Sequence, residues 1–255
     1  MRFSSLLKTG FLALGLATIT STAQAQGSAV VSHDEWLTGP GTFNVNEQQF
    51  LTNVLGFFSV SSGNVLIYSS NGFLTNSAFT NFLTAAGLNV TINDAAASFA
   101  GYSVVFGGGN ATQNGAGLAS YVLGGGHVFY EGGTGAGGPV AEAAYSAPFL
   151  NALGLAFAPS YNGLGTVTTS GFAGQSPYGA ALFTGVPDVY ANNGNNITAA
   201  APVAGVTTQI FSDGNQNGVF AVAQVVTATP EPASLVLLAT GLLALAPAVR
   251  RRSRS

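Results

Sequence analysis

The chain has 255 residues, contains no Cys, and is only 6% charged. Without Cys it can form no disulfide, thiolate metal site or Cys nucleophile. All six basic residues lie before Thr9 or after Val249, whereas the span between them holds all nine acids. Because phosphate neutralisation requires Lys or Arg, this charge distribution excludes a nucleic-acid partner, and we predict no nucleotide or other cofactor.

Residues 1–25 have the pattern of a secretory signal peptide. Arg2 and Lys8 precede an apolar run over Phe11–Ile19, which is followed by an Ala-Gln-Ala cleavage site. The alternative is a first transmembrane helix, but the run is shorter than the ~20 residues that a span needs. We therefore predict export through the inner membrane and a mature chain that begins near Gln26.

The densest polar cluster of the chain follows, at Ser32–Trp36. Its members His33, Asp34 and Glu35 are residue types that bind metals. Adjacent residues on an extended segment point to alternate faces, however, and rarely ligate one ion together. We interpret the cluster as structural, with a metal site as the less favoured alternative.

Strand-like and helix-like segments then alternate, which predicts βαβ units and a parallel sheet. The predicted strands are Asn64–Ser70, Asn89–Asn93, Tyr102–Phe106 and His127–Tyr130, and the predicted helices are Asn46–Phe58 with Asn46 as N-cap, Phe73–Ala86, Leu118–Leu123 and Pro139–Leu153. We expect an α/β fold, a three-layer sandwich with a mostly parallel central sheet, in one domain of residues 26–228.

Parallel sheets bind ligands beyond the carboxyl ends of their strands. The residues that could line a ligand there are Ser69, Ser70, Asn71, Gly108, Gly109, Asn110, Glu131 and Thr134. Glu131 is the candidate catalytic group, because burial at the end of a central strand would raise its pKa and suit it to acid/base chemistry. The favoured interpretation is a structural carboxylate that accepts backbone N–H bonds from the loop that follows it.

That glycine-rich loop, Gly133–Gly138, matches the dinucleotide-binding pattern G-x-G-x-x-G. A true fingerprint ends the first strand of its sheet and is followed by an acid about 20 residues later. Here the loop follows the fourth predicted strand, and no acid is suitably placed. We therefore predict no nucleotide site.

The segments NVLIYSS, GYSVVFGGG and HVFYEGGTG, in this order between Asn64 and Gly138, resemble the class I glutamine amidotransferase-like domain, which has a flavodoxin-like fold. Catalytic members of that family carry a Cys on the tight turn after the strand that corresponds to His127–Tyr130, and a His further on. This chain has Glu131 and Gly132 at that turn, and no His follows His127. The resemblance implies the fold without the amidotransferase chemistry.

Strand-like runs in the second half are predicted to extend the same sheet: Gly165–Ser170, Val186–Tyr190, Val203–Phe211 and Val219–Val226. Between the last two, Asp213–Gly218 fits the first half of a calcium loop, with Asp213, Asn215 and Asn217 as candidate ligands. The twelfth position is Gln224, where a bidentate Glu is needed. A β-hairpin turn explains the same residues and is the favoured interpretation.

Residues 229–255 carry the most specific signal in the chain. A Pro-Glu-Pro motif is followed by seventeen mostly apolar residues, 233–249, long enough for one membrane helix, and then by a basic end. The motif is Pro230, Glu231 and Pro232, and the basic end includes Arg250, Arg251 and Arg252. This order resembles the PEP-CTERM sorting signal, which implies a Gram-negative host and an exosortase that removes the tail. The alternative is a plain C-terminal anchor.

Together these features predict an exported, transiently membrane-anchored protein that reaches the cell surface or an exopolysaccharide matrix, with a non-catalytic binding or structural role. Its polar, uncharged composition suits neutral partners, sugars among them. The alternative is an extracellular hydrolase that acts on a glycan with Glu131 as acid/base. Two carboxylates in one cleft would favour that alternative, and the obvious second acid is Glu142.

Overall fold

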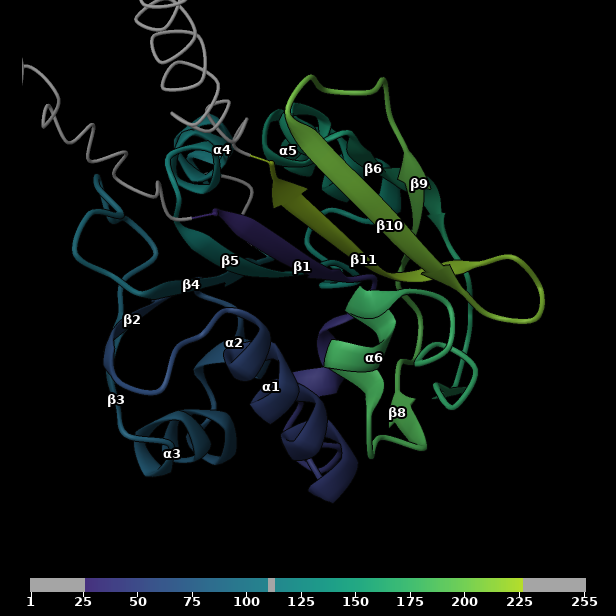
Figure 1. Ribbon diagram of the computed structural model, residues 1–255, viewed down its shortest axis with the longest axis horizontal. Coiled ribbons are helices and arrows are strands. Elements are labelled where there is room, and N and C mark those ends of the chain that lie inside the picture. The colour runs from purple at the N-terminus through teal and green to yellow at the C-terminus, as the bar shows by residue number, and fades with distance from the viewer. Residues whose placement is uncertain (1–25, 110–112, 227–255) are drawn as a thin grey trace, which may run out of the picture. The chain divides into compact units, whose positions relative to one another are not determined.

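A seven-stranded sheet runs through the centre of the fold (Figure 1). The computed structural model describes residues 26–109 and 113–226. In space the strand order is β10-β11-β1-β5-β4-β2-β3. The strands are β1 (Ser28–Ser32), β2 (Gly63–Tyr68), β3 (Leu88–Ile92), β4 (Val104–Gly108), β5 (His127–Glu131), β10 (Val206–Ser212) and β11 (Gly218–Val225). Within this sheet β11 alone runs opposite to the other six strands, so the prediction of a mostly parallel α/β sheet is confirmed.

One strand in the interior of the sheet, β1, is absent from the sequence prediction. It lies between β5 and β11, and all five of its residues are buried. A short strand that is buried on both faces shows no alternation of polar and apolar side chains. Moreover, Ser28 and Ser32 flank its apolar centre and disguise it as a polar segment. The strand that carries Glu131 is therefore the fifth along the chain and not the fourth.

Helices cover both faces of the sheet and make the three layers expected of this class (Figure 1). On one face lie α1 (Val45–Phe57), α2 (Gly72–Thr75), α3 (Ser77–Ala85) and α6 (Pro177–Phe183), and on the other lie α4 (Gly115–Leu123) and α5 (Pro139–Leu150). Because side chains alternate along a strand, Val30 and Phe129 point into the first core, whereas Val31 and Tyr130 point into the second. Each face of the sheet thus buries its own apolar cluster.

Two predicted helix boundaries are corrected by their caps. The N-cap of α1 is Asn44 and not Asn46: the Asn44 side chain accepts from Asn46 N at 2.8 Å, and Glu47 accepts from Asn44 N at 3.1 Å. This reciprocal capping box fixes the start of the helix. The predicted helix Phe73–Ala86 is interrupted at Asn76, whose side chain caps α3.

The second half of the chain extends the central sheet only in part. β10 and β11 add a hairpin beside β1, whereas the other strands form two separate two-stranded sheets. One sheet pairs β6 (Leu155–Tyr161) with β9 (Asn195–Ala199), and the other pairs β7 (Thr166–Thr168) with β8 (Asp188–Tyr190). In the described part of the chain, β7 and β8 pair only with each other, so their predicted place in the central sheet is wrong.

Within residues 26–109 and 113–226, no helix is long and apolar enough to cross a membrane. The predicted signal peptide, 1–25, and the predicted membrane helix, 233–249, lie outside the described residues. The Pro-Glu-Pro motif and the basic end of the tail lie outside them as well.

Candidate functional site

The candidate site lies beyond the carboxyl ends of β2 and β4, where the strand order reverses. The next strand after β2 in the chain, β3, lies on one side of the β2–β4 pair, and the next strand after β4, β5, lies on the opposite side. Open α/β sheets bind ligands at such a switch point. The predicted lining residues meet here: the Ser69 hydroxyl donates to Gly108 O at 2.6 Å. A Cβ added at Gly109 would lie 2.8 Å from Asn71 Nδ2 and 3.0 Å from Thr134 Cβ.

The close approach of these loops depends on the glycine after β4. Gly109 has a φ of +66°, a left-handed conformation that glycine adopts without strain. Of the other predicted lining residues, Ser70 is exposed, and Asn110 lies outside the described residues.

An acid that the sequence prediction assigned to another cluster, Glu35, belongs to this site. It begins the short 3-10 helix η1 (Glu35–Thr38), which follows β1, and its carboxylate accepts a hydrogen bond from the Asn71 side-chain amide. Burial is the main cause that raises the pKa of Glu35 to about 7. The Asn71 hydrogen bond opposes this shift, and the nearby carboxylates of Asp34 and Glu142 add to it. Glu35 follows β1 closely. If β1 had been predicted as a parallel neighbour of β5, Glu35 would have been placed at the carboxyl ends of the strands.

Glu131, the candidate catalytic residue, is enclosed by the protein. Its side chain is 1% exposed, and the Thr38 hydroxyl donates to its Oε2 at 3.0 Å. Its Oε1 is buried without a hydrogen-bond partner among the described residues. Burial raises the pKa of Glu131 well above its usual value, and the carboxylates of Glu35 and Asp34 add to this shift. Burial therefore disfavours ionisation of Glu131, and its one hydrogen bond comes from a side-chain hydroxyl. The described residues place no loop N–H group on its carboxyl oxygens, so the interpretation as a carboxylate bound by loop N–H groups is wrong.

Glu142, the predicted second acid, organises the glycine-rich loop. Its Oε1 accepts from Thr134 N at 2.6 Å and from the Thr134 hydroxyl, and its Oε2 accepts from the Tyr161 hydroxyl at 2.9 Å. The Glu142 carboxylate lies in the first turn of α5, where a nucleotide-binding loop would hold a phosphate. An acid in that place repels phosphate, which agrees with the prediction of no nucleotide site.

The polar cluster after β1 has the structural contacts that we favoured. His33 is fully buried, with its Nδ1 3.1 Å from Val219 O, and burial lowers its pKa to about 4. The Asp34 carboxylate accepts from Trp36 N at 3.3 Å and from Asn193 N at 2.6 Å. Among the described residues no three His, Cys, Asp or Glu side chains come together in a way that could hold a metal ion.

The candidate calcium loop is the turn of the β10–β11 hairpin. Asp213 Oδ1 accepts from the backbone N–H groups of Asn215 and Asn217, at 2.9 and 2.8 Å, and Oδ2 accepts from Asn217 Nδ2 at 2.9 Å. Burial alone would raise the pKa of Asp213, but these hydrogen bonds outweigh it and lower the pKa. Because a calcium site needs oxygen atoms and these groups are N–H donors, the hairpin accounts for the residues.

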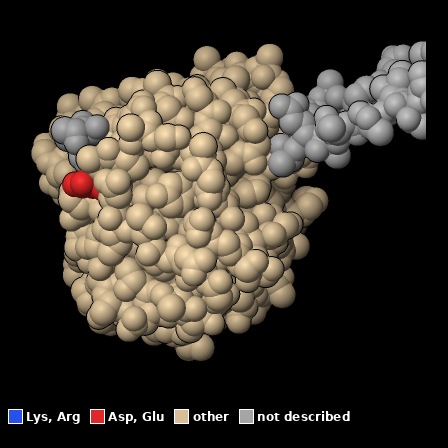
Figure 2. Space-filling model, turned by 90° about the vertical axis from the view of Figure 1, so that its left-hand side faces the viewer, with Lys and Arg blue, Asp and Glu red and all other residues tan. Residues whose placement is uncertain are grey.

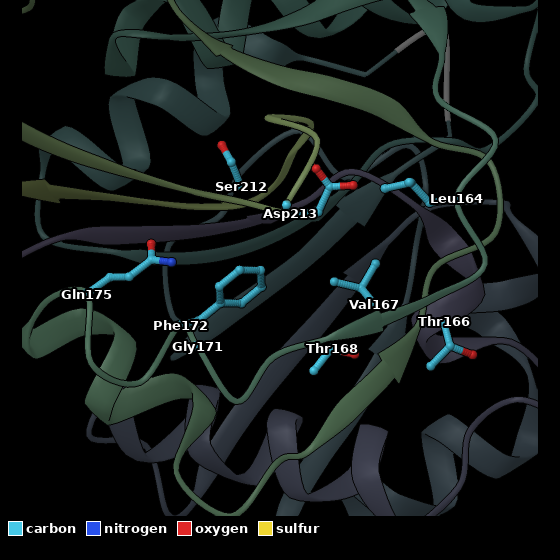
Figure 3. Close-up of a pocket in the computed structure, with 10 residues that line it drawn as sticks. Leu164, Thr166, Val167, Thr168, Gly171, Phe172, Gln175, Ser212 and Asp213 are labelled. Atoms are coloured by element: carbon cyan, nitrogen blue, oxygen red, sulfur yellow. The ribbon is translucent and has the colours of Figure 1, made fainter.

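A cleft of about 450 Å³ opens at the same edge of the sheet, beside the end of β10 (Figure 3). It lies between the β10–β11 hairpin, β7, and the segment after β7. Its lining residues are Leu164, Thr166, Val167, Thr168, Gly171, Phe172, Gln175, Ser212, Asp213 and Gly214. The sequence prediction found only Asp213 of this set, because it expected β7 to lie inside the central sheet and not beside the hairpin.

Uncharged residues dominate the surface of this part of the chain. Figure 2 shows a face on which acidic atoms occupy one small area and the rest is neutral. Residues 26–109 and 113–226 contain no Lys or Arg. The fold and its sites thus define an α/β protein with an almost uncharged surface.

Comparison with known proteins identifies no relative of this chain. No protein-family model matches it, and no curated protein and no solved structure shows significant similarity to it.

The buried acids predict that stability falls as pH rises through neutrality. Glu131 and Glu35 hold their protons more tightly in the folded chain, because burial raises their pKa values. Their contribution to stability is complete at low pH and is lost as pH rises through the folded pKa. His33 opposes this trend only below its usual pKa of 6.5. Above about pH 6.5 we expect the free energy of unfolding to fall by at most about 1.4 kcal/mol per pH unit for each acid that is still protonated in the fold. The contribution of Glu35 ends soon after pH 7, whereas that of Glu131 continues to higher pH.

The variant Glu131→Gln isolates one of these contributions. It is isosteric with the protonated acid, keeps an oxygen for the Thr38 hydroxyl, and cannot ionise. Urea unfolding at several pH values should give a flatter profile for the variant than for the wild type. A wild-type stability that rises across this pH window, or identical slopes for both proteins, would contradict a neutral Glu131.

Two glycines of the loop after β5 provide a matched test of its packing. Gly133 and Gly135 have left-handed φ values of +65° and +71°. A Cβ at Gly133 would lie 2.8 Å from both Asp34 Oδ1 and Gly194 Cα, whereas a Cβ at Gly135 meets nothing within 4 Å. Both Ala variants suffer the backbone strain, but only Gly133→Ala adds a steric clash. We expect it to lose about 2 kcal/mol more stability than Gly135→Ala in urea unfolding, and equal losses would contradict this packing.

Proposed function

We propose that the chain is an exported, non-catalytic protein of the cell surface or extracellular matrix. The observation that carries this proposal is the state of Glu131, which stands where the resembled amidotransferase family has its nucleophile. Its carboxyl group is 1% exposed and hydrogen-bonded to Thr38, and burial raises its pKa well above the usual value. A group that substrate cannot reach has no role in turnover, so the scaffold supports binding or structure.

The strand order supports a flavodoxin-like, amidotransferase-like assignment of the fold. The parallel strands lie in the order β3-β2-β4-β5-β1. If β2 is counted as the first strand, this is the flavodoxin order 2-1-3-4-5, with the N-terminal strand β1 in the fifth position. The part of the chain that resembles the family, Asn64–Gly138, supplies the other four strands.

The terminal segments supply the proposed route. The signal peptide directs export through the inner membrane, and the 233–249 helix holds the chain there transiently. An exosortase then recognises the Pro-Glu-Pro motif and removes the tail, after which the protein joins the cell surface or the exopolysaccharide matrix. This step of the proposal rests on the order of motif, apolar run and basic end in the sequence.

A glycan hydrolase remains the second candidate, because Glu35 has a pKa of about 7 and lies near the Glu142 carboxylate. Such a pair of acids is typical of glycosidases, where both face the substrate. Here Glu142 is 1% exposed, and both of its oxygens accept hydrogen bonds from the protein. Because these hydrogen bonds occupy both carboxylate oxygens of Glu142, they favour the non-catalytic role.

Processing gives the direct test of the proposed route. The exported protein should begin near Gln26 and end near Pro230–Pro232, as measured by intact-mass analysis. In a variant with Ala-Ala-Ala in place of the Pro-Glu-Pro motif, the signal peptide should still be removed while the tail stays attached. Released wild-type protein that still carries Arg250–Arg254 would refute exosortase processing.

The absence of catalysis is tested separately. Neither the wild type nor Glu131→Gln should release reducing ends from a panel of polysaccharides, because the Glu131 carboxyl group does not reach the surface. Wild-type turnover that falls by about 100-fold or more in Glu131→Gln would establish the hydrolase instead.

A further inference from the structure

The cleft beside β10 differs from the other polar clusters in how its side chains are engaged. At the switch point, the polar groups of Ser69, Asn71 and Glu142 are bound to other parts of the protein. In the cleft, the side chains of Gln175 and Ser212 make no hydrogen bond within the described residues. The cleft therefore retains hydrogen-bonding capacity that the fold itself does not use.

These groups surround an apolar floor. Phe172 and Val167 form that floor and are largely buried in the core of the α1 face. In Figure 3 the Gln175 amide lies on one side of the Phe172 ring and the Asp213 carboxylate lies above it. The volume of about 450 Å³ falls within the ~300–1,000 Å³ of small-molecule sites.

The charge of the cleft restricts its ligand. The pKa of Asp213 is lowered, so this group is an anion at neutral pH, and no Lys or Arg occurs between Thr9 and Val249 to balance it. An anionic ligand would be repelled. Asp213 can only accept hydrogen bonds, whereas Gln175 and Ser212 can both donate and accept. A ligand with several hydroxyl groups supplies both functions.

We propose that this cleft binds a neutral saccharide. The Asp213 carboxylate accepts from one or two sugar hydroxyls, and Gln175 and Ser212 pair with their neighbours. Phe172 and Val167, at 3% and 4% exposure, only close the base of the cleft. Asp213 keeps its place because its Oδ1 accepts from two hairpin N–H groups and its Oδ2 accepts from the Asn217 amide, and each carboxylate oxygen can accept a further hydrogen bond. The inference rests on the proposed role as a non-catalytic binding module. The two proposals can fail separately. A tail that stays on the exported protein contradicts only the export route, and a lack of saccharide binding contradicts only the assignment of the cleft.

The test is a ligand-observed NMR titration of the full chain in a detergent without a sugar headgroup. The probes are cellotetraose, maltotetraose and β-1,4-mannotetraose, with tetragalacturonic acid as the anionic comparison and a chitosan tetramer as the cationic one. At least one neutral probe should bind with a Kd of about 1 mM or tighter. Gln175→Ala should weaken this binding by about 3- to 10-fold, the loss of one hydrogen bond. Gln49→Ala, on the exposed face of α1, should leave it unchanged.

A second variant separates neutral from cationic ligands. Gln175→Glu keeps the shape of the side chain and adds a second negative charge, so it should not improve binding of the neutral probe. Binding of the chitosan tetramer above all neutral probes, with a gain in Gln175→Glu, would overturn the proposal in favour of a cationic ligand. The proposal is equally overturned if no neutral probe binds, if tetragalacturonic acid binds as well as they do, or if Gln175→Ala and Gln49→Ala behave alike.

Discussion

The lack of Lys and Arg between Thr9 and Val249 determines how this fold can bury its acids. A carboxyl group that leaves water needs a cation or several hydrogen-bond donors, and otherwise it takes up a proton. In the described part of this chain the donors are backbone N–H groups, hydroxyls and amides. Glu142 has both oxygens occupied by such donors, whereas Glu131 has a single donor, Thr38, and a strongly raised pKa.

The acids that do find donors connect the two halves of the chain. Asp34 accepts from Asn193 N at 2.6 Å, a residue 159 positions later, and Glu47 accepts from Tyr190 N at 2.8 Å, 143 positions later. These charge-assisted bonds fix the loops around β8 against η1 and α1, the role that salt bridges have in most domains. The glycine-rich loop after β5 could be mistaken for a binding element. It is ordered instead by hydrogen bonds to the Glu142 carboxylate of the protein itself.

The features that the sequence predicts well are those with a local signal. Alternating strands and helices give the mostly parallel sheet, and the turn pattern at Asp213 gives the hairpin. Two errors have non-local causes. β1 is too short and too evenly buried to show a period, so the position of Glu35 beside Glu131 could not be inferred without it. The cleft depends on β7 pairing with β8 outside the central sheet, a long-range pairing that no local pattern indicates.

Both corrections favour the cleft beside β10 over the switch point as the place where a ligand binds. The switch point attracts attention because its residue types suit chemistry, yet its side chains are hydrogen-bonded within the protein, and burial raises the pKa of Glu131. Ligand binding there would first have to break the bonds of Glu142 and Asn71. The β10 cleft requires no such rearrangement, because Gln175 and Ser212 are already free to pair. On energetic grounds a ligand should therefore prefer the cleft to the crevice in which α/β sheets usually bind.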